Sequence, residues 1–577
     1  MRYELRLTTT ASGVGHFACA PAEAASFDEY LGYLRHNPMD SFMHVHLLEM
    51  MGTLDAGAAA EILDAARGRD PIVTALLCEA SLAFPRLAGL QERFTRAEAE
   101  ELLAFTPLIY IKSGLMEGRE AHQQWIRALD ENISKHRAPV PPEELGLAPL
   151  FEESELPEEP GAAAVRRQFG GDVAGRDFGA PLSATETARM AIEKIGALGL
   201  FAGEETRHGS SLSPYGFLRK WRVTASVRHG RCDYSFSGVQ TSYGKGLTED
   251  AARASYSMEV VERASSFASI GSEGVIGRTR PYPLTQARHS ELALRGVRAL
   301  DPNSLRLEAP YADEALWWME GETPGEGSGG ATEAVLVPAQ CVFLFCNLDE
   351  PGLFSGLGST GLASGTTMEQ AKASALLEVI ERDAEASTPF APSRCFRLEA
   401  TTPEVASLLA DYEARGVHIA FQEFAGALGV PCYKCFVRDK NGAVIKGTGA
   451  HLDGKRALLS ALTETPYHYP DGPPSAPAPA GLRTMRFEEL PDFSSGTPGG
   501  DLAILEAALA EEGLRPVYVD ITRADIGIPV VKAIVPGLWI MAAFDAFSRV
   551  SPKIFARYLR EARLRRAESL ASLTTLA

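Results

Sequence analysis

The chain has 577 residues, is 45% hydrophobic and 23% charged, and carries 56 basic against 75 acidic residues, for a net charge of −19. This composition excludes a wholly disordered chain. The acidic balance argues against nonspecific nucleic-acid binding, although a local basic patch is compatible with it. The longest apolar runs fall short of the roughly 20 residues that span a bilayer. The first residues lack the apolar core of a secretion signal. We therefore expect a cytoplasmic protein that binds neither nucleic acid nor membrane.

The first part of the chain, residues 1–136, is predicted to be an all-helical domain, because Ala, Leu and Glu recur there at helical spacing. The expected helices lie near 24–36, 40–51, 56–68, 71–83, 95–105 and 117–134. His44 and His46 are two residues apart, so they would point to different helix faces and are interpreted as packing or surface residues. Residues 137–180 begin with a run rich in Pro and Glu and are predicted to be a linker.

A mixed α+β domain is predicted for residues 181–577, where short β-branched and aromatic runs alternate with Ala- and Glu-rich helical stretches. The expected strands include 220–230, 340–348, 417–424, 515–521 and 527–538. The eight cysteines are irregularly spaced, which indicates reduced thiols. Cys432 and Cys435 form a CxxC inside a predicted buried strand. Because no second CxxC completes a zinc site, they are interpreted as core residues.

An internal repeat at an offset of 119 residues is the strongest feature of the sequence. The segments 246-GLTEDAARASYSMEVVER-263 and 365-GTTMEQAKASALLEVIER-382 are identical at nine of eighteen positions. Each keeps a serine, two glutamates and an arginine at offsets of 0, 4, 7 and 8, which lie on one face of a helix. These residues are Ser255, Glu259, Glu262 and Arg263 in the first copy, and Ser374, Glu378, Glu381 and Arg382 in the second.

The charged stripe has two interpretations. One is a solvated helix face with an i,i+4 ion pair worth a few tenths of a kcal/mol. The other is a site, because the rest of each helix is apolar, as in a buried helix, and the stripe recurs in both copies. Buried carboxylates cost several kcal/mol each unless they are neutralised, and two arginines do not balance four glutamates. Magnesium would balance them, so the repeats are predicted to enclose a magnesium nucleotide.

The cations of this region would then contact phosphate. Arg263 and Arg382 could clamp it, and Lys245 adds a cation beside glycines, where backbone N–H groups can approach an anion.

Two segments of the sequence resemble known phosphate-binding loops but do not match them. The segment from Gly238 to Lys245 fails the P-loop spacing, and Gly246 stands where Ser or Thr is required. The 356-GLGSTG-361 match to GxGxxG does not join a strand directly to a helix, as a Rossmann loop must.

Together these motifs resemble the YcaO family over roughly 181–560. The matching segments are 242-SYGKG-246, 255-SYSMEVVER-263 and 359-STGLASGTTMEQAKASALLEVIERD-383, followed by 447-GTGAHLDGKRALLSALTE-464 and 526-IGIPVVKAIVPGL-538. The resemblance implies a YcaO-type fold with duplicated halves around a nucleotide site. It also implies ATP- and magnesium-dependent activation of a peptide backbone amide. In this family the amide oxygen attacks ATP, and a thiol or hydroxyl then closes an azoline ring, or sulfide makes a thioamide.

By resemblance, Glu259, Glu262, Glu378 and Glu381 would hold magnesium. Lys245, Ser255, Arg263, Thr366, Gln370, Ser374 and Arg382 would bind the nucleotide. The implied partners are a ribosomally made peptide or a protein as substrate, and a TfuA-like or leader-binding protein. A second copy of the chain is a further candidate. Residues 1–136 lie outside the resemblance and would either recruit a substrate or partner, or only stabilise the protein.

Several positions depart from the family pattern. Thr360 and Thr366 replace asparagines, Gln370 replaces a glutamate that is usually a metal ligand, and Tyr469 stands near a usual arginine. The final residues lack the Pro-x-Pro-x-Pro tail of many azoline-forming members, which favours thioamidation or an unassigned reaction over azoline formation. Two alternatives stay open: a degenerate scaffold that binds nucleotide or leader peptide without turnover, and an accessory factor for methylthiolation of a ribosomal protein. In the branch of the family that the second alternative concerns, the extra helices follow the core. Here the extra helices precede the core, which weakens that alternative.

Overall fold

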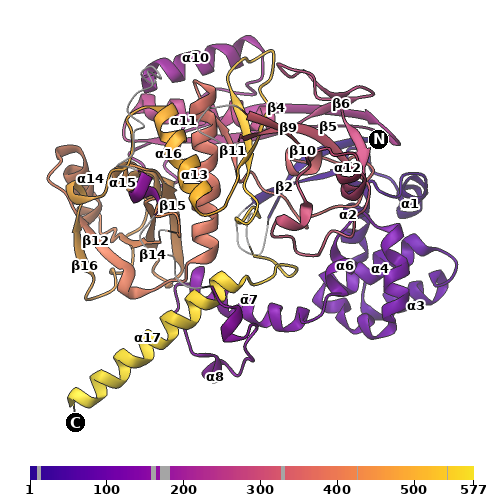
Figure 1. Ribbon diagram of the computed structural model, residues 1–577, viewed down its shortest axis with the longest axis horizontal. Coiled ribbons are helices and arrows are strands. Elements are labelled where there is room, and N and C mark those ends of the chain that lie inside the picture. The colour runs from indigo at the N-terminus through magenta and orange to yellow at the C-terminus, as the bar shows by residue number, and fades with distance from the viewer. Residues whose placement is uncertain are drawn as a thin grey trace.

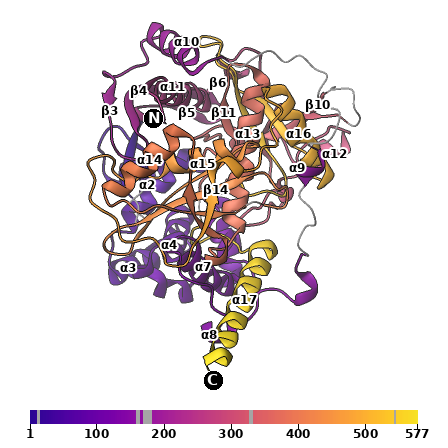
Figure 2. The same cartoon turned by 90° about the vertical axis from the view of Figure 1, so that its left-hand side faces the viewer.

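Three β-sheets, each with helices packed on it, form the core of the protein (Figures 1 and 2). The structure is a computed structural model and describes residues 1–9, 15–157, 164–168, 182–325, 332–424, 426–541 and 544–576. This arrangement confirms the prediction of a mixed α and β fold. The sheets meet around helices α11 and α13, which carry the repeated motif.

The first sheet has the strand order β2-β1-β5-β4-β6-β7, with β3 paired to β4. A long antiparallel hairpin of β4 and β5 forms its centre, with Tyr215 opposite Gly246 and His229 opposite Cys232. Along most of β4 buried and exposed residues alternate, as in a sheet with one solvated face. Its strands are β1 (Arg2–Thr9), β2 (Gly15–Pro21), β3 (Thr206–Arg207), β4 (Tyr215–His229), β5 (Cys232–Gly246), β6 (Ser269–Gly271) and β7 (Gly274–Ile276). Helices α10 (Ala184–Ala197) and α11 (Glu249–Ser266) pack together, and α11 lies against β4 and β5.

The second sheet has the order β10-β9-β17-β18-β11, with β8 paired to β9. Its strands are β8 (Thr285–Ala287), β9 (Leu316–Pro324), β10 (Thr332–Pro338), β11 (Leu362–Ser364), β17 (Val517–Asp520) and β18 (Val530–Ile534). Helix α13 (Met368–Ser387) packs on β11 and β18, and α16 (Pro498–Glu511) packs on α13. The short helix α12 (His289–Leu294) precedes β9.

The third sheet has the order β15-β14-β13-β12-β16. Its strands are β12 (Cys395–Glu399), β13 (Ala420–Glu423), β14 (Cys432–Arg438), β15 (Val444–Ala450) and β16 (Arg483–Arg486). Helix α15 (Gly454–Glu464) packs on β14 and β15. Helix α14 (Pro403–Ala414) contributes Val405, Leu408 and Tyr412 to the same core. Cys432 and Cys435 are buried in β14, in agreement with their interpretation as core residues.

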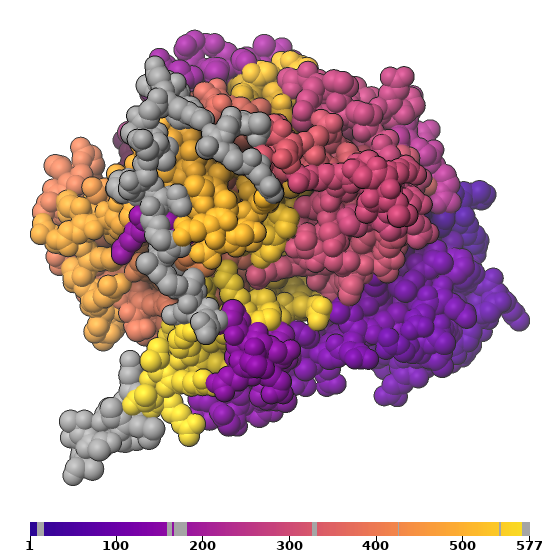
Figure 3. All heavy atoms as spheres, in the orientation of Figure 1, coloured from indigo at the N-terminus to yellow at the C-terminus, as the bar shows by residue number. Residues whose placement is uncertain are grey.

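Six N-terminal helices follow the predicted segments: α1 (Phe27–His36), α2 (Ser41–Met51), α3 (Ala56–Ala66), α4 (Pro71–Ala83), α5 (Arg96–Leu102) and α7 (Arg119–Ile133). The short helix α6 (Tyr110–Gly114) lies between two predicted segments and was not predicted. Figure 3 shows them as a lobe that lies directly against the middle part of the chain. His44 is fully buried and its Nε2 is hydrogen-bonded to Glu79 at 2.6 Å. His46 packs its ring edge-on against Tyr30. Both histidines are therefore packing residues.

The structure corrects the all-helical prediction at the start of the chain. Residues 2–9 and 15–21 are strands, and β1 pairs in parallel with β5 of the first sheet. Tyr3 is buried and its hydroxyl donates to Asp40, 2.7 Å away. Because the partner strand of β1 lies far along the chain, no local sequence pattern predicts the pairing. The domain boundaries at 136 and 180 stay predictions.

The described parts of the predicted linker contain structured segments. Helix α8 (Pro142–Leu145) and the residues around it bring Leu147, Leu150 and Phe151 against helix α17 (Pro552–Leu576). Helix α9 (Ala164–Gln168) buries Ala164 and Val165 against the core under α13. Apolar residues spaced among the prolines and glutamates explain this packing. The remaining residues of 137–180 lie outside the described residues.

The predicted strand over 340–348 is wrong. The strand is β10, which ends at Pro338, and a short 3₁₀ turn over Ala339–Cys341 follows it. Cys341, Val342 and Phe343 are buried all the same, so the apolar run reflects burial and not extended pairing. In the described ranges, the chain contains no helix whose length and apolar character would suffice to cross a membrane.

Candidate active site

The repeated motif forms two equivalent strand–helix units. In each, a threonine caps the helix: Thr248 accepts from Ala251 N at the start of α11, and Thr367 accepts from Gln370 N at the start of α13. A glycine before each helix lets the preceding backbone pass close to the helix. A Cβ on Gly244 would lie 1.9 Å from the carbonyl oxygen of Ala252, and one on Gly365 would lie 2.4 Å from the nitrogen of Ala371. No other residue fits this contact without moving the backbone.

The same construction occurs a third time, in β15 and α15. A Cβ on Gly449 would lie 2.4 Å from the carbonyl oxygen of Ala457 in α15. This helix ends at Glu464, which our sequence reasoning did not assign to the site. The sequence contained a signal for it, because Glu464 follows Gly449 at the same spacing as Glu259 follows Gly244.

Helices α11 and α13 are largely buried, and their polar stripes are the parts that reach the solvent. In α11, Tyr256, Val260 and Val261 are fully buried, whereas the side chains of Glu259 and Glu262 are 32% and 17% exposed. In α13, Leu376, Val379 and Ile380 are buried, whereas Ser374, Glu378, Glu381 and Arg382 are partly exposed. The interpretation of largely buried helices with a narrow charged stripe is thus confirmed, and both stripes reach the solvent.

The carboxylates of α11 are held by a backbone amide and one arginine. Glu259 accepts a hydrogen bond from Tyr243 N at 3.1 Å, and Arg263 Nε lies 3.8 Å from Glu259 and 3.6 Å from Glu262. Burial raises the pKa of Glu262 to about 8, and the neighbouring charges of Glu378 and Glu259 add to this rise against the opposing effect of Arg263. Burial also raises the pKa of Glu259. The negative charge of this stripe is therefore only partly compensated.

The carboxylates of α13 are in a similar situation. Glu378 accepts from Gly361 N at 3.2 Å, and Glu381 accepts from the hydroxyl of Thr448 in β15 at 2.6 Å. Burial raises the pKa of Glu378, and it raises the pKa of Glu381 to about 7. Arg382 turns toward Glu385, one turn further along the helix, at 3.6 Å.

Two cations complete the site. Lys245, which the sequence predicted, forms an ion pair with Glu464, so the first and third units meet there. Lys532, which our reasoning missed, is buried in β18 and donates to the carbonyl of Thr360 at 2.6 Å. Burial lowers the pKa of Lys532 to about 8, while the charges of Glu378 and Glu262 oppose that shift. A lysine inside an apolar strand was the only signal for it in the sequence.

The residues present fit magnesium bound together with phosphate. Among the described residues, no three His, Cys, Asp or Glu side chains converge closely enough to form a metal site on their own. Magnesium, however, is usually held by one or two carboxylates together with water and substrate phosphates. Two opposed stripes, each with two carboxylates of raised pKa, offer such partial sites.

The remaining predicted residues take different positions. Ser255 is exposed and Ser374 is half-buried on their stripes. Gln370 and Thr366 bind each other, because Oε1 of Gln370 accepts from both the amide and the hydroxyl of Thr366, at 2.8 and 2.7 Å. Tyr469 packs on Tyr412 of α14, and its hydroxyl donates to Asp411. Tyr469 is thus a core residue of the third sheet.

The fold is built of repeated strand–helix units, and the carboxylate stripes on two of their helices could hold magnesium together with a phosphate-bearing ligand. A family model described as YcaO cyclodehydratase, ATP- and Mg²⁺-binding, matches residues 243–471 and 466–539. The chain belongs to the YcaO family, and ATP and Mg²⁺ are the cofactors of that family.

Two relatives are similar to this chain in sequence. An uncharacterized protein of Methanothermobacter thermautotrophicus is 32% identical over 400 residues, which cover 61% of this chain and 95% of that protein. A Rhizobium leguminosarum bv. trifolii protein, named as an uncharacterized protein in the tfuA 3′ region, is 27% identical over 238 residues. That match covers 38% of this chain and 53% of the relative.

Two solved structures share parts of the architecture. A heterocyclase in complex with substrate and cofactor superposes with a TM-score of 0.48 and 19% identity, over 66% of this chain and 59% of that one. YcaO from Methanopyrus kandleri, bound with AMPPCP and Mg²⁺, superposes with a TM-score of 0.44 and 22% identity, over 62% of this chain and 91% of that one.

Proposed function

We propose that this protein uses ATP and Mg²⁺ to activate a backbone amide of a ribosomally made peptide or a protein, for thioamidation or azoline formation. The observation that carries the proposal is the pair of charged stripes on α11 and α13, both packed on β11 and β18, where the charge of Glu378 contributes to the raised pKa of Glu262. Family membership supplies the class of reaction. Phosphoryl transfer requires positioning and charge compensation more than covalent help from the protein, which matches the residues present.

In the proposed reaction the amide oxygen forms a bond to the γ-phosphorus of ATP, and ADP leaves. A thiol, hydroxyl or sulfide then adds to the amide carbon, and phosphate departs with the former amide oxygen. Magnesium would offset the charge of the phosphates. Glu259, Glu262, Glu378 and Glu381 would hold it, while Arg263, Arg382 and Lys245 would orient the phosphate oxygens.

Thioamidation with a TfuA-like partner is the version that we favour. It is supported by the relative whose name places it beside tfuA. A comparison of peptides and proteins from cells with and without the gene would separate the two chemistries, because replacing oxygen by sulfur raises the mass and losing water lowers it. A loss of water would overturn the thioamidation version.

The first experiment is calorimetric titration of ATP with and without Mg²⁺, on the natural protein and on the double variant Glu259→Gln/Glu378→Gln. We expect magnesium-dependent binding that the double variant loses. Glu369→Gln is the matched control, because Glu369 lies exposed at the start of α13. Unchanged binding in the double variant would refute the carboxylate site, and no binding by the natural protein would favour a degenerate scaffold.

A further inference from the structure

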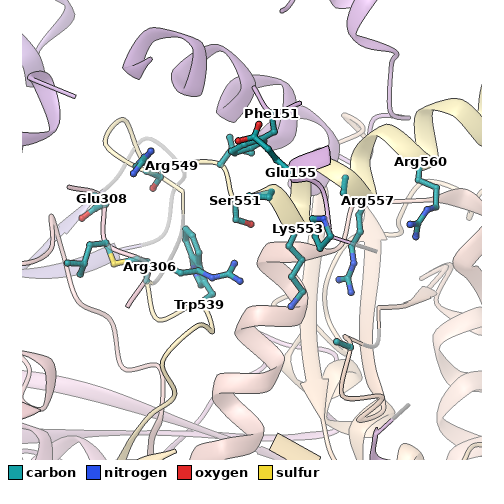
Figure 4. A pocket seen from close by; sticks show the side chains of 18 of the residues that line it. Phe151, Glu155, Arg306, Glu308, Trp539, Arg549, Ser551, Lys553, Arg557 and Arg560 are labelled. Atoms are coloured by element: carbon teal, nitrogen blue, oxygen red, sulfur yellow. The ribbon is translucent and has the colours of Figure 1, made fainter. Parts of the chain in front are cut away.

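A pocket of about 830 Å³ lies away from the ATP site, at the C-terminal end of α13. Its walls come from residues 151–157, 306–308, 539–541 and 548–553 and from the first turns of α17 (Figure 4). Asp383 directly follows Arg382 but is buried on this other side of α13, where it lines an adjoining small cavity. The proposed ATP chemistry uses none of these residues.

Positive charge exceeds negative charge around Asp383. Its carboxylate accepts from Lys553 Nζ at 2.6 Å and from the backbone nitrogen of Trp539 at 3.1 Å, and Arg306 lies 4.0 Å away. Arg557 of α17 donates to the neutral oxygens of Ser387 and Thr388. Figure 4 shows Lys553 and Arg557 extending from α17 in the same direction. One buried carboxylate thus stands among three cations, in a chain whose net charge is −19.

The acidic residues that line the pocket, Glu155, Glu308 and Glu512, are fewer than its cations, which are Arg306, Arg549, Lys553, Arg557 and Arg560. Glu308 is engaged by the amide and hydroxyl of Ser355, and burial together with the charge of Asp545 raises its pKa to about 7. Arg549 adds a further cation at an exposed position of the rim. The start of α17 adds the partial positive charge of a helix N-terminus, capped where Ser551 Oγ accepts from Ile554 N.

The pocket also has apolar walls. Trp539, Met541 and Val550 are buried residues that line it, and Phe151 closes the opposite side. Its volume lies in the range of cavities that bury a small ligand or a short chain segment. A group of cations, Arg306, Lys553 and Arg557, next to aromatic walls fits a ligand that is both anionic and apolar.

The chain itself shows that acidic peptide suits this surface. Residues 151–157 read FEESELP and run past the pocket. Within this run Glu155 lines the pocket and Glu153 forms an ion pair with Arg563 of α17 at 3.4 Å. An acidic and apolar stretch of polypeptide is therefore already seated along the rim.

We propose that this pocket binds an acidic segment of a peptide, with one carboxylate beside Arg306, Lys553 and Arg557 and one apolar side chain against Trp539 and Phe151. The inference rests on the proposed function, since that function supplies a peptide substrate. The pocket would hold a recognition segment of the substrate, while the reacting amide lies at the carboxylate stripes on the other side of α13.

The test is fluorescence anisotropy of the full-length protein with a fluorescein-labelled peptide EEFLEE and its neutral counterpart QQFLQQ. We expect the acidic peptide to bind at least tenfold more tightly, and its affinity to fall as salt screens the charges. Arg306→Gln/Arg549→Gln should weaken binding about tenfold, and Trp539→Leu should weaken it as well. The control Arg228→Gln alters an exposed arginine of β4 and should change nothing.

Equal binding of both peptides, or unchanged binding by the double variant, would overturn the proposal. Displacement of the peptide by inorganic phosphate at low millimolar concentration would also overturn it, because the site would then be one for small anions. If the double variant does not fold, Arg549→Gln alone makes the same test at the exposed rim. Magnesium-dependent ATP binding, measured on the same samples, separates failure of this inference from failure of the proposed function.

Discussion

The hydroxyl of Thr448 in β15 donates a hydrogen bond of 2.6 Å to the carboxylate of Glu381 in α13. This bond ties the third strand–helix unit to the second, at the charged stripe of α13. A hydrogen bond to a charged acceptor favours the ionised carboxylate, so Thr448 opposes the effect of burial on the pKa of Glu381.

Replacing Thr448 should therefore weaken magnesium-dependent ATP binding. Thr448→Val keeps the shape of the side chain and removes the donor, and a loss of about 1 kcal/mol corresponds to roughly a fivefold weaker affinity. Thr448→Ser retains the hydroxyl and should bind as the natural protein does. Calorimetry on both variants checks this, and equal affinities would show that Glu381 does not depend on the bond.

Removing Lys532 should make the protein depend more on its cofactors. In Lys532→Met, Glu378 and Glu262 lose a buried cation, so we expect a melting temperature several degrees lower. Magnesium and ATP together should raise that temperature more in the variant than in the natural protein, because the metal would supply the missing charge. Scanning fluorimetry with and without MgATP measures both shifts, and Lys220→Met serves as an exposed control. Identical shifts in variant and natural protein would contradict the expectation.

Restoring the family's glutamate at Gln370 tests the departures directly. In the variant Gln370→Glu, the new carboxylate could still accept both hydrogen bonds that Thr366 now donates, so this variant should fold normally. We expect the natural protein to hydrolyse or transfer phosphate from ATP, and the variant to need about two- to fivefold less magnesium, because of its extra charge. Gln370→Ala controls for the lost hydrogen bonds. If turnover appeared only after Gln370→Glu and Thr366→Asn were combined, the natural chain would be a scaffold.

The buried Lys434 should make stability depend on pH. It is 1% exposed, and burial, with the nearby charge of Lys446, lowers its pKa from 10.5 to about 7. Between these two values the unfolded chain binds the proton and the folded one does not, so this group makes stability rise with pH from about 7 to 10.5.

Lys434→Met should accordingly raise the melting temperature at pH 7, by an amount that reflects a few kcal/mol, and the gain should shrink by about pH 9.5. The exposed Lys440→Met is the matched control. A gain that stayed constant from about pH 7 to about pH 9.5 would mean that Lys434 does not titrate in this range.

Much of the candidate site could be predicted from the sequence, because its residues form a local sequence pattern. The N-terminal helices and the charged stripes of α11 and α13 were predicted because their residues recur at helical spacing. What escaped prediction depends on contacts between distant segments. Strand β1 finds its partner β5 far along the chain, and Lys532 becomes a site residue only because β18 lies under α13. Burial likewise made residues 340–348 resemble a strand, since apolar runs do not distinguish a buried turn from a buried strand.

The parallel pairing of β1 with β5 has a consequence for any shortened form of this protein. Residues 233–246 of β5 lead directly into the capped helix that carries Glu259 and Glu262. Without residues 1–21, Ser235 to Gly238 of β5 would lose their partner strand and present unpaired amide and carbonyl groups, which invite pairing with another chain. Deleting residues 1–21 would therefore yield an aggregation-prone sheet, and loss of ATP binding in such a fragment would report that open edge and not the chemistry of the carboxylate stripes.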